Sequence, residues 1–189
     1  MKQIEGIRAE HAKLVADWSR EADFAKLVGR EGYLGSIFDE ILEEIAAETN
    51  SILVALPNVA HVTVEFLTES VTKSGTTSRD IKTVLRVNGT ETTAKGGLSG
   101  GQQSAVEWAM DLAVGAVIGR RLGVAMAFLM LDETFDGLDT VTKEAALEVL
   151  QTYAQDRLVL VVTHANEFKE FFTTSLDIEF KEGVSRLVL

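Results

Sequence analysis

The sequence has 189 residues and a formal net charge of −11, from 18 Lys and Arg residues against 29 Asp and Glu residues. Hydrophobic residues make up 46% of it, so the chain can bury a core of one-domain size and is not expected to be intrinsically disordered. It contains no cysteine, which excludes disulfides, thiol nucleophiles and zinc–thiolate sites. No apolar run is long enough for a membrane span or a signal peptide, and the acidic balance disfavours DNA binding by this chain alone. We therefore expect a cytoplasmic protein with no membrane partner.

Helical periodicity marks the first part of the sequence. Residues 1–28 repeat in steps of three and four, with apolar or small residues and weak positions at His11 and Glu21. This pattern fits the end of a coiled-coil arm, and it fits an ordinary amphipathic helix equally well. A glycine-containing break at residues 29–32 precedes a second helix, whose apolar face includes Leu34, Ile41 and Ile45 and which ends before Pro57.

The period then changes to two. Residues 62–67 and 81–87 alternate between apolar and polar side chains, which predicts a β-hairpin with a long polar tip at residues 72–80. Asn88 and Gly89 form a further turn signal.

From Gly96 onward helices alternate with short apolar strands. We expect helices at residues 101–121 and 141–155, and buried strands at 127–131 and 158–162. A short helix at 166–172 and strands at 176–181 and 184–189 complete the chain. This alternation predicts an α/β fold with a parallel sheet, in which functional groups gather at the carboxyl ends of the strands.

Three polar clusters suit phosphate chemistry, and each also has a purely structural interpretation. Leu98-Ser99-Gly100-Gly101-Gln102 precedes a helix, where Ser99 can cap it and the glycines let backbone N–H groups approach a phosphate; the segment could also be only a capping turn. Asp132 and Glu133 end a strand, where one carboxylate can hold Mg²⁺ and the other can orient water; they could also be solvated acids.

The remaining polar cluster ends the second apolar strand. His164 can donate to a phosphate oxygen or a water, or it can be an ordinary structural histidine. Between these strands, Gly137-Leu138-Asp139 precedes a helix that Asp139 could simply cap.

The fixed order of these clusters resembles the ABC-type ATPase head. The LSGGQ segment looks like the signature motif, Asp132-Glu133 like the end of Walker B, Gly137-Leu138-Asp139 like the D-loop, and His164 like the switch histidine. The long helix after the signature, and the helices and hairpin before it, are similar to the C-terminal half of SMC-like repair ATPases, such as the ATPase subunit of the SbcCD-type recombination nuclease and its phage relatives. Two departures are Gln102, where SMC-like proteins often have Glu, and Thr134-Phe135, where transporters usually have a proline.

The resemblance implies roles for these residues in an assembled dimer of heads. Ser99, Gly100, Gly101 and Gln102 would contact the γ-phosphate of ATP held by the opposing head, and Asp139 would cross the dimer interface. Asp132 would help to hold Mg²⁺, Glu133 would be the general base or orient water, and His164 would sense the γ-phosphate.

The phosphate-cradling Walker A loop, G-x-x-x-x-G-K-[ST], does not occur in the sequence. In the SMC-like family this loop lies in an N-terminal half, beyond a long coiled coil. The resemblance therefore implies that residues 29–189 are the C-terminal lobe of a P-loop NTPase-like head and that residues 1–28 are a coiled-coil stub. The implied partners are a Walker A-bearing lobe, a second ATPase head in a homodimer, a nuclease subunit and DNA.

Two other functions stay open at this point. One is the ATPase module of an ABC transporter or a translation-type ABC protein, which a membrane partner would distinguish. The other is a non-enzymatic interaction lobe, which a neighbouring gene encoding a P-loop and a coiled coil would argue against.

Overall fold

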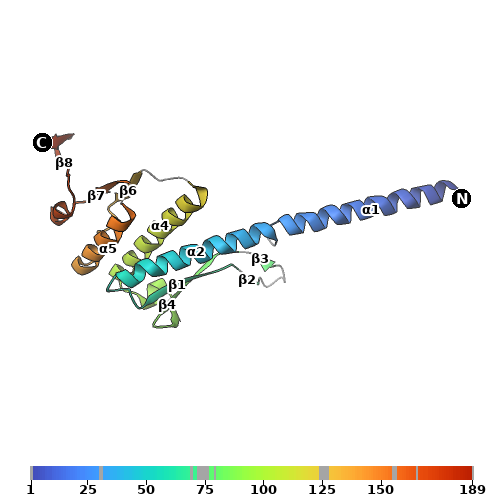
Figure 1. Ribbon diagram of the computed structural model, residues 1–189, viewed down its shortest axis with the longest axis horizontal. Coiled ribbons are helices and arrows are strands. Elements are labelled where there is room, and N and C mark those ends of the chain that lie inside the picture. Colours follow the sequence, from blue (N-terminus) through green and yellow to red (C-terminus); the bar gives the residue numbers. More distant parts are fainter. Residues whose placement is uncertain are drawn as a thin grey trace. The chain divides into compact units, whose positions relative to one another are not determined.

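Figure 1 shows the computed structural model of the protein. The structure describes residues 2–29, 32–68, 70–71, 77–78, 80–123, 128–154, 157–164 and 166–188. Some sequence-predicted features therefore lie outside the described residues: Met1, Arg30 and Glu31 in the first break, most of the tip at 72–80, Ala127, residue 155 and Leu189. The side chains of Ile4 and Ile7 are also outside the description.

Two long helices begin the chain, as the periodicity predicts. Helix α1 spans Lys2–Val28, and its described large apolar side chains are exposed, including Trp18 at 72%. Helix α2 spans Tyr33–Ala55 and ends just before Pro57, which lacks the N–H needed to continue a helix. The buried side chains of α2 lie toward its carboxyl end: Leu42, Ile45, Thr49, Ile52 and Leu53.

The predicted hairpin is present and is larger than expected. Strands β1 (Val62–Leu67), β4 (Lys82–Val87) and β5 (Thr90–Thr92) form one sheet in the order β1-β4-β5. The turn between β4 and β5 has positive φ at Asn88 and Gly89, the conformation that tight two-residue hairpins require. Short strands β2 (Ser70–Val71) and β3 (Thr77–Ser78) pair within the tip.

A helix–strand–helix–strand segment follows the one-turn helix α3 (Ala94–Gly97). It consists of α4 (Gly100–Leu122), β6 (Phe128–Asp132), α5 (Thr140–Tyr153) and β7 (Leu158–Val162). Strands β6 and β7 are parallel and pair in register from Phe128 with Leu158 to Asp132 with Val162. The predicted α/β arrangement with a parallel sheet is confirmed.

The expectation that β6 and β7 are buried is wrong for one of their faces. Phe128, Met130, Leu158, Leu160 and Val162 are 39–68% exposed, whereas the alternate residues are half-buried. Parallel strands normally have both faces covered, because crossover helices pack on each side of the sheet. In the described part of the chain β6 and β7 form a sheet of two strands, and the exposures show that this apolar face is uncovered there.

The 3₁₀ helix η1 (Asn166–Phe171) and the antiparallel hairpin of β8 (Asp177–Lys181) and β9 (Val184–Val188) end the described chain. The chain divides into two compact units, residues 1–47 with 64–84 and residues 48–63 with 85–189. All candidate functional residues belong to the second unit, whose core includes Leu56, Val59, Trp108, Phe135 and Leu147. None of the described helices is both long and apolar enough to cross a membrane.

Candidate functional site

The LSGGQ segment forms the amino end of α4. Ser99 is the N-cap residue, and its Oγ accepts a hydrogen bond from the backbone N–H of Gln102 at 3.3 Å. The Gln102 Oε1 in turn accepts from the Ser99 N–H at 2.9 Å, which completes a capping box. The predicted N-cap is confirmed. Gly100 is exposed, so this helix start, with its partial positive charge, faces solvent and can receive an anion.

The Gly137 segment lies directly against this helix start. A Cβ atom placed on Gly101 would be 3.2 Å from the Gly137 carbonyl oxygen, and a Cβ atom on Gly137 would be 2.2 Å from the Ser104 Oγ. Glycine is therefore needed at Gly137 for close approach, whereas its backbone conformation does not demand it.

Asp139 caps α5, as the structural interpretation of this residue predicts. Its Oδ1 accepts from the Thr142 backbone N–H at 3.0 Å, and its Oδ2 accepts from the Thr142 hydroxyl at 3.0 Å. The Thr142 backbone N–H makes the largest contribution to lowering the pKa of Asp139 below its ordinary value, and the Thr142 hydroxyl and the Asn58 side chain lower it further. Asp139 is thus a carboxylate at neutral pH.

Asn58 joins these two helix starts, and sequence reasoning missed it. Its side-chain Nδ2 donates to the Asp139 Oδ2, and its backbone oxygen accepts from the Gln102 Nε2 at 3.1 Å. The sequence offers only Pro57-Asn58 as a turn signal, which gives no indication of contacts with residues 102 and 139.

A second polar group lies at the carboxyl ends of β6 and β7. The Glu133 Oε1 is 2.7 Å from the His164 Nε2, and both side chains are largely exposed. The Glu133 N–H donates to the Val162 carbonyl oxygen at 2.9 Å, and Glu133 has a positive φ of 51°. Both residues lie at the carboxyl ends of their strands, and the strand pairing brings their side chains together. A carboxylate held by an imidazole can orient a water molecule and accept its proton.

Asp132 is exposed at the end of β6, next to Glu133. Among the described residues no group of three or more His, Asp or Glu side chains could hold a metal ion. Mg²⁺ in phosphoryl-transfer sites is often held by one or two carboxylates, with phosphate oxygens and waters completing the shell. Asp132 fits the part of one such ligand.

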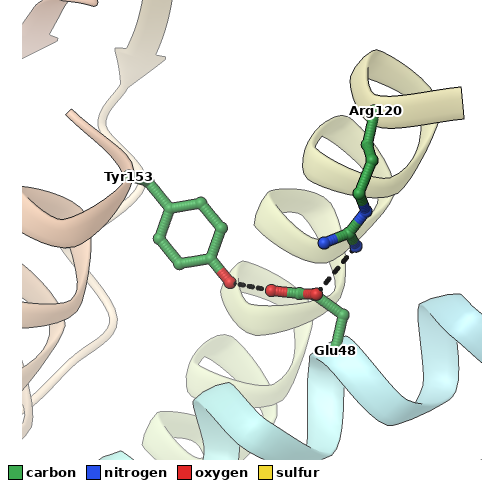
Figure 2. A network of polar contacts seen from close by, with 3 residues as sticks. All are labelled: Glu48, Arg120 and Tyr153. Carbon is green, nitrogen blue, oxygen red and sulfur yellow. Dashed lines mark hydrogen bonds and ion pairs between the residues drawn. The ribbon is translucent and has the colours of Figure 1, made fainter. Parts of the chain in front are cut away.

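A polar network joins three helices, with Glu48 and Tyr153 half-buried and Arg120 exposed (Figure 2). Glu48 on α2 accepts from the Arg120 guanidinium of α4 at 2.9 Å and from the Tyr153 hydroxyl of α5. Burial alone would raise the pKa of Glu48, but the hydrogen bonds from Tyr153 and Arg120 lower it overall. Burial, followed by the hydrogen bond to Glu48 and its charge, raises the pKa of Tyr153. These residues are far apart in the sequence, and no motif indicates their contact.

Comparisons with known proteins identify similar sequences and folds. Residues 65–152 match the family model described as "SbcC/RAD50-like, Walker B motif". This segment contains the LSGGQ helix, the Asp132-Glu133 strand end and Asp139. The chain has the fold of the C-terminal half of an SMC-like ABC ATPase head. The resemblance and fold class inferred from the sequence are thereby confirmed. No curated protein sequence matches the chain.

Solved SMC-like heads share this fold at low sequence identity. A structure titled for ATP-driven dimerization and DNA-stimulated activation of SMC ATPases aligns with a TM-score of 0.62 and 15% identity, covering 81% of this chain and 87% of that one. The Smc head domain with a coiled coil and joint from Pyrococcus yayanosii aligns with a TM-score of 0.70 and 17% identity. The alignment covers 96% of this chain and 33% of that one. The Smc head with an extended coiled coil from Pyrococcus furiosus, bound to the C-terminal domain of ScpA, aligns with a TM-score of 0.67 and 15% identity. The alignment covers 96% of this chain and 42% of that one. The chain thus spans less than half of the two Pyrococcus head chains.

Proposed function

We propose that this chain is one lobe of an ATPase head, which hydrolyses ATP when a Walker A-bearing lobe completes it and a second head joins it. The observation that carries the proposal is the Glu133–His164 pair at the ends of two adjacent parallel strands. In this arrangement Glu133 orients or deprotonates the attacking water and His164 contacts the γ-phosphate. Bound Mg²⁺ would neutralise developing phosphate charge, with Asp132 among its ligands.

The second part of the proposed site acts on nucleotide held by the opposing head. Ser99, Gly100, Gly101 and Gln102 contact its γ-phosphate through the amino end of α4, and Asp139 lies at the interface between heads. The capped, exposed helix start and the adjacent carboxylate of Asp139 support this assignment. On the same proposal, residues 29–189 form the C-terminal lobe and residues 1–28 continue into a coiled-coil arm.

The exposed face of β6 and β7 supports the need for a Walker A-bearing lobe. Five apolar side chains on this face are exposed, which is costly in water unless another polypeptide covers them. A lobe that packs against this face and adds strands at the edge of the sheet would cover the apolar side chains and place its phosphate-binding loop near Asp132 and Glu133. That lobe can belong to the same chain or to a separate one.

At the level of the complex, we propose that ATP-driven engagement of two heads is coupled to the processing or recombination of DNA breaks with a nuclease partner. Support comes from the SbcC/RAD50-like match, and from the structural neighbour titled for DNA-stimulated activation of SMC ATPases.

ATP binding and turnover test the proposal with and without the Walker A-bearing lobe. Isothermal titration of the purified chain with ATP-Mg should give weak or no binding and no turnover, because the sequence lacks the Walker A motif, which supplies a nest of phosphate-binding N–H groups and a lysine. Adding the polypeptide from the same genome that carries the P-loop should restore both. The matched control is that polypeptide with its P-loop lysine changed to alanine, which should restore neither. Low-micromolar ATP binding by the chain alone, or no turnover by the pair, would contradict the proposal.

A further inference from the structure

Asn58 contacts the polar groups at the starts of two different helices. It lies in the turn between α2 and β1, beside the fully buried Val59. Its backbone oxygen accepts from Gln102 at 3.1 Å, at the start of α4, and its side chain donates to Asp139, at the start of α5. One residue thus joins the LSGGQ segment to the N-cap of the next helix.

Neither helix needs Asn58 for its own cap. Helix α4 is capped reciprocally by Ser99 and Gln102, and α5 is capped by Asp139 through Thr142. The hydrogen bonds of Asn58 are therefore additional to those that cap each helix. What they add is a fixed separation between two helix starts, each of which carries partial positive charge.

The backbone packing beside Asn58 makes the same connection. The Gly137 carbonyl oxygen lies close to Gly101, so the segment leading to Asp139 already rests on the LSGGQ helix. Asn58 ties the ends of these two segments through polar contacts. Its amide also contributes to keeping Asp139 in the charged form.

We propose that Asn58 is a positioning residue, which holds the LSGGQ helix start and Asp139 as one rigid unit so that both engage a second, nucleotide-bearing head together. This inference rests on the proposed function. Fixing the two groups beforehand removes the cost of ordering them at the moment of engagement. Removing the Asn58 side chain breaks its contact with Asp139 and leaves the backbone contact with Gln102 in place, so it should weaken the engagement of heads without slowing the chemical step within an engaged dimer.

The test compares Asn58→Ala and Asn58→Asp with Gln151→Ala, which removes an exposed carboxamide from α5. In the isolated chain, NMR titration should show a raised pKa for Asp139 in both Asn58 variants and no change in the control. Asn58→Asp should have the larger effect, since it places a second carboxylate beside Asp139.

In the complete head with its Walker A-bearing lobe, the ATP concentration for half-maximal dimerisation should rise about tenfold in Asn58→Ala, the equivalent of one hydrogen bond to a charged group. The rise should be larger in Asn58→Asp, while kcat at saturating ATP stays within about twofold. If Asn58 had only a structural role, the substitutions would lower the melting temperature and the active fraction and leave the ATP concentration for half-maximal dimerisation unchanged. That result would overturn the proposal. A wild-type ATP concentration for half-maximal dimerisation in both Asn58 variants would also overturn this inference, and it would leave the proposed function unaffected. Failure of the wild-type head to dimerise with ATP would remove the proposed function and this inference together.

Discussion

The indole ring of Trp108 lies against the phenyl ring of Phe135, with ring centroids 5.9 Å apart and planes inclined at 43°. Both side chains are buried, at 4% and 1% exposure. Trp108 belongs to α4, and Phe135 follows Glu133 by two residues. The Trp108 Nε1 is buried with no hydrogen-bond partner, so the indole acts here through packing. The loop that carries the proposed water-orienting carboxylate is therefore anchored on the helix that starts at LSGGQ.

Replacing Phe135 with alanine should destabilise the chain by about 3–5 kcal/mol, because it removes a fully buried ring and leaves a cavity beside Trp108. Urea unfolding followed by fluorescence measures the change. The Trp18→Phe background leaves Trp108 as the only tryptophan, since the chain has two. Phe180→Ala, at a position 72% exposed, is the control and should stay within about 0.5 kcal/mol. Equal effects of the two variants would contradict the anchoring role.

Glu133→Gln in the complete head should abolish ATP hydrolysis and preserve ATP binding and engagement of heads. Glutamine keeps the shape of the side chain and can still contact His164, but it cannot accept the proton of water. Steady-state turnover and nucleotide titration measure the two effects separately. Near-normal turnover by the variant would show that Glu133 is not the general base.

Ser99→Arg should block ATP-dependent dimerisation, because a bulky cation at the exposed start of α4 would displace the incoming phosphate. It also removes the N-cap, which costs about 1 kcal/mol. Ser99→Ala is the matched control, since it loses the same cap without added bulk. Light scattering with ATP should show no dimer for the arginine variant and dimers for the alanine variant. ATP-driven dimers of Ser99→Arg at wild-type nucleotide concentrations would contradict the assignment.

Glu48 should make the stability of the chain depend on pH below its ordinary pKa near 4.5. Its folded pKa lies below the unfolded value, so its contribution is present above the unfolded pKa and disappears as the pH falls through the folded pKa. Glu48→Gln should therefore be less stable than wild type at pH 7, and the difference should shrink as the pH falls below 4.5. Urea unfolding across this pH range measures the difference, and a constant gap would contradict the network.

Tyr153 should ionise only above the usual range for tyrosine, since its pKa is raised. Its folded pKa exceeds the unfolded value, so the stability it contributes is present below the unfolded pKa near 10 and is lost as the pH rises through the folded value. The chain has one other tyrosine, Tyr33, so a Tyr33→Phe variant lets tyrosinate absorbance report Tyr153 alone. Adding Glu48→Gln should bring the ionisation to lower pH. Ionisation of Tyr153 at the usual pH would contradict the hydrogen bond.

Local sequence signals predicted most elements because each depends on neighbouring residues. The capping box at Ser99, the turn at Asn88-Gly89 and the end of α2 before Pro57 follow from short-range chemistry. The meeting of Glu133 and His164 was also predictable, because parallel strands bring their carboxyl ends to one edge.

Contacts between distant segments could not be predicted in this way. Asn58 reaches Gln102 and Asp139 from a turn that carries no motif, and Glu48 meets Tyr153, which is 105 residues further along the chain. The apolar character of β6 and β7 predicted burial, and it does not reveal that one face lacks cover in the described chain. An apolar strand sequence shows that the faces of the strand need to be buried. Which polypeptide buries them depends on residues outside the strand.

The parallel pairing of β6 and β7 also has a consequence for the order of folding. Phe128 pairs with Leu158 across the whole of α5, whereas Lys181 pairs with Val184 across the turn at Glu182 and Gly183. Closing the longer loop costs more chain entropy, so amide protection measured by pulsed hydrogen exchange should appear in β8 and β9 before β6 and β7. Until that later step, the apolar strands that carry Asp132 and Val162 are unpaired at their edges as well as uncovered on one face. A newly made chain is therefore most prone to aggregate in the interval before its strand pair closes.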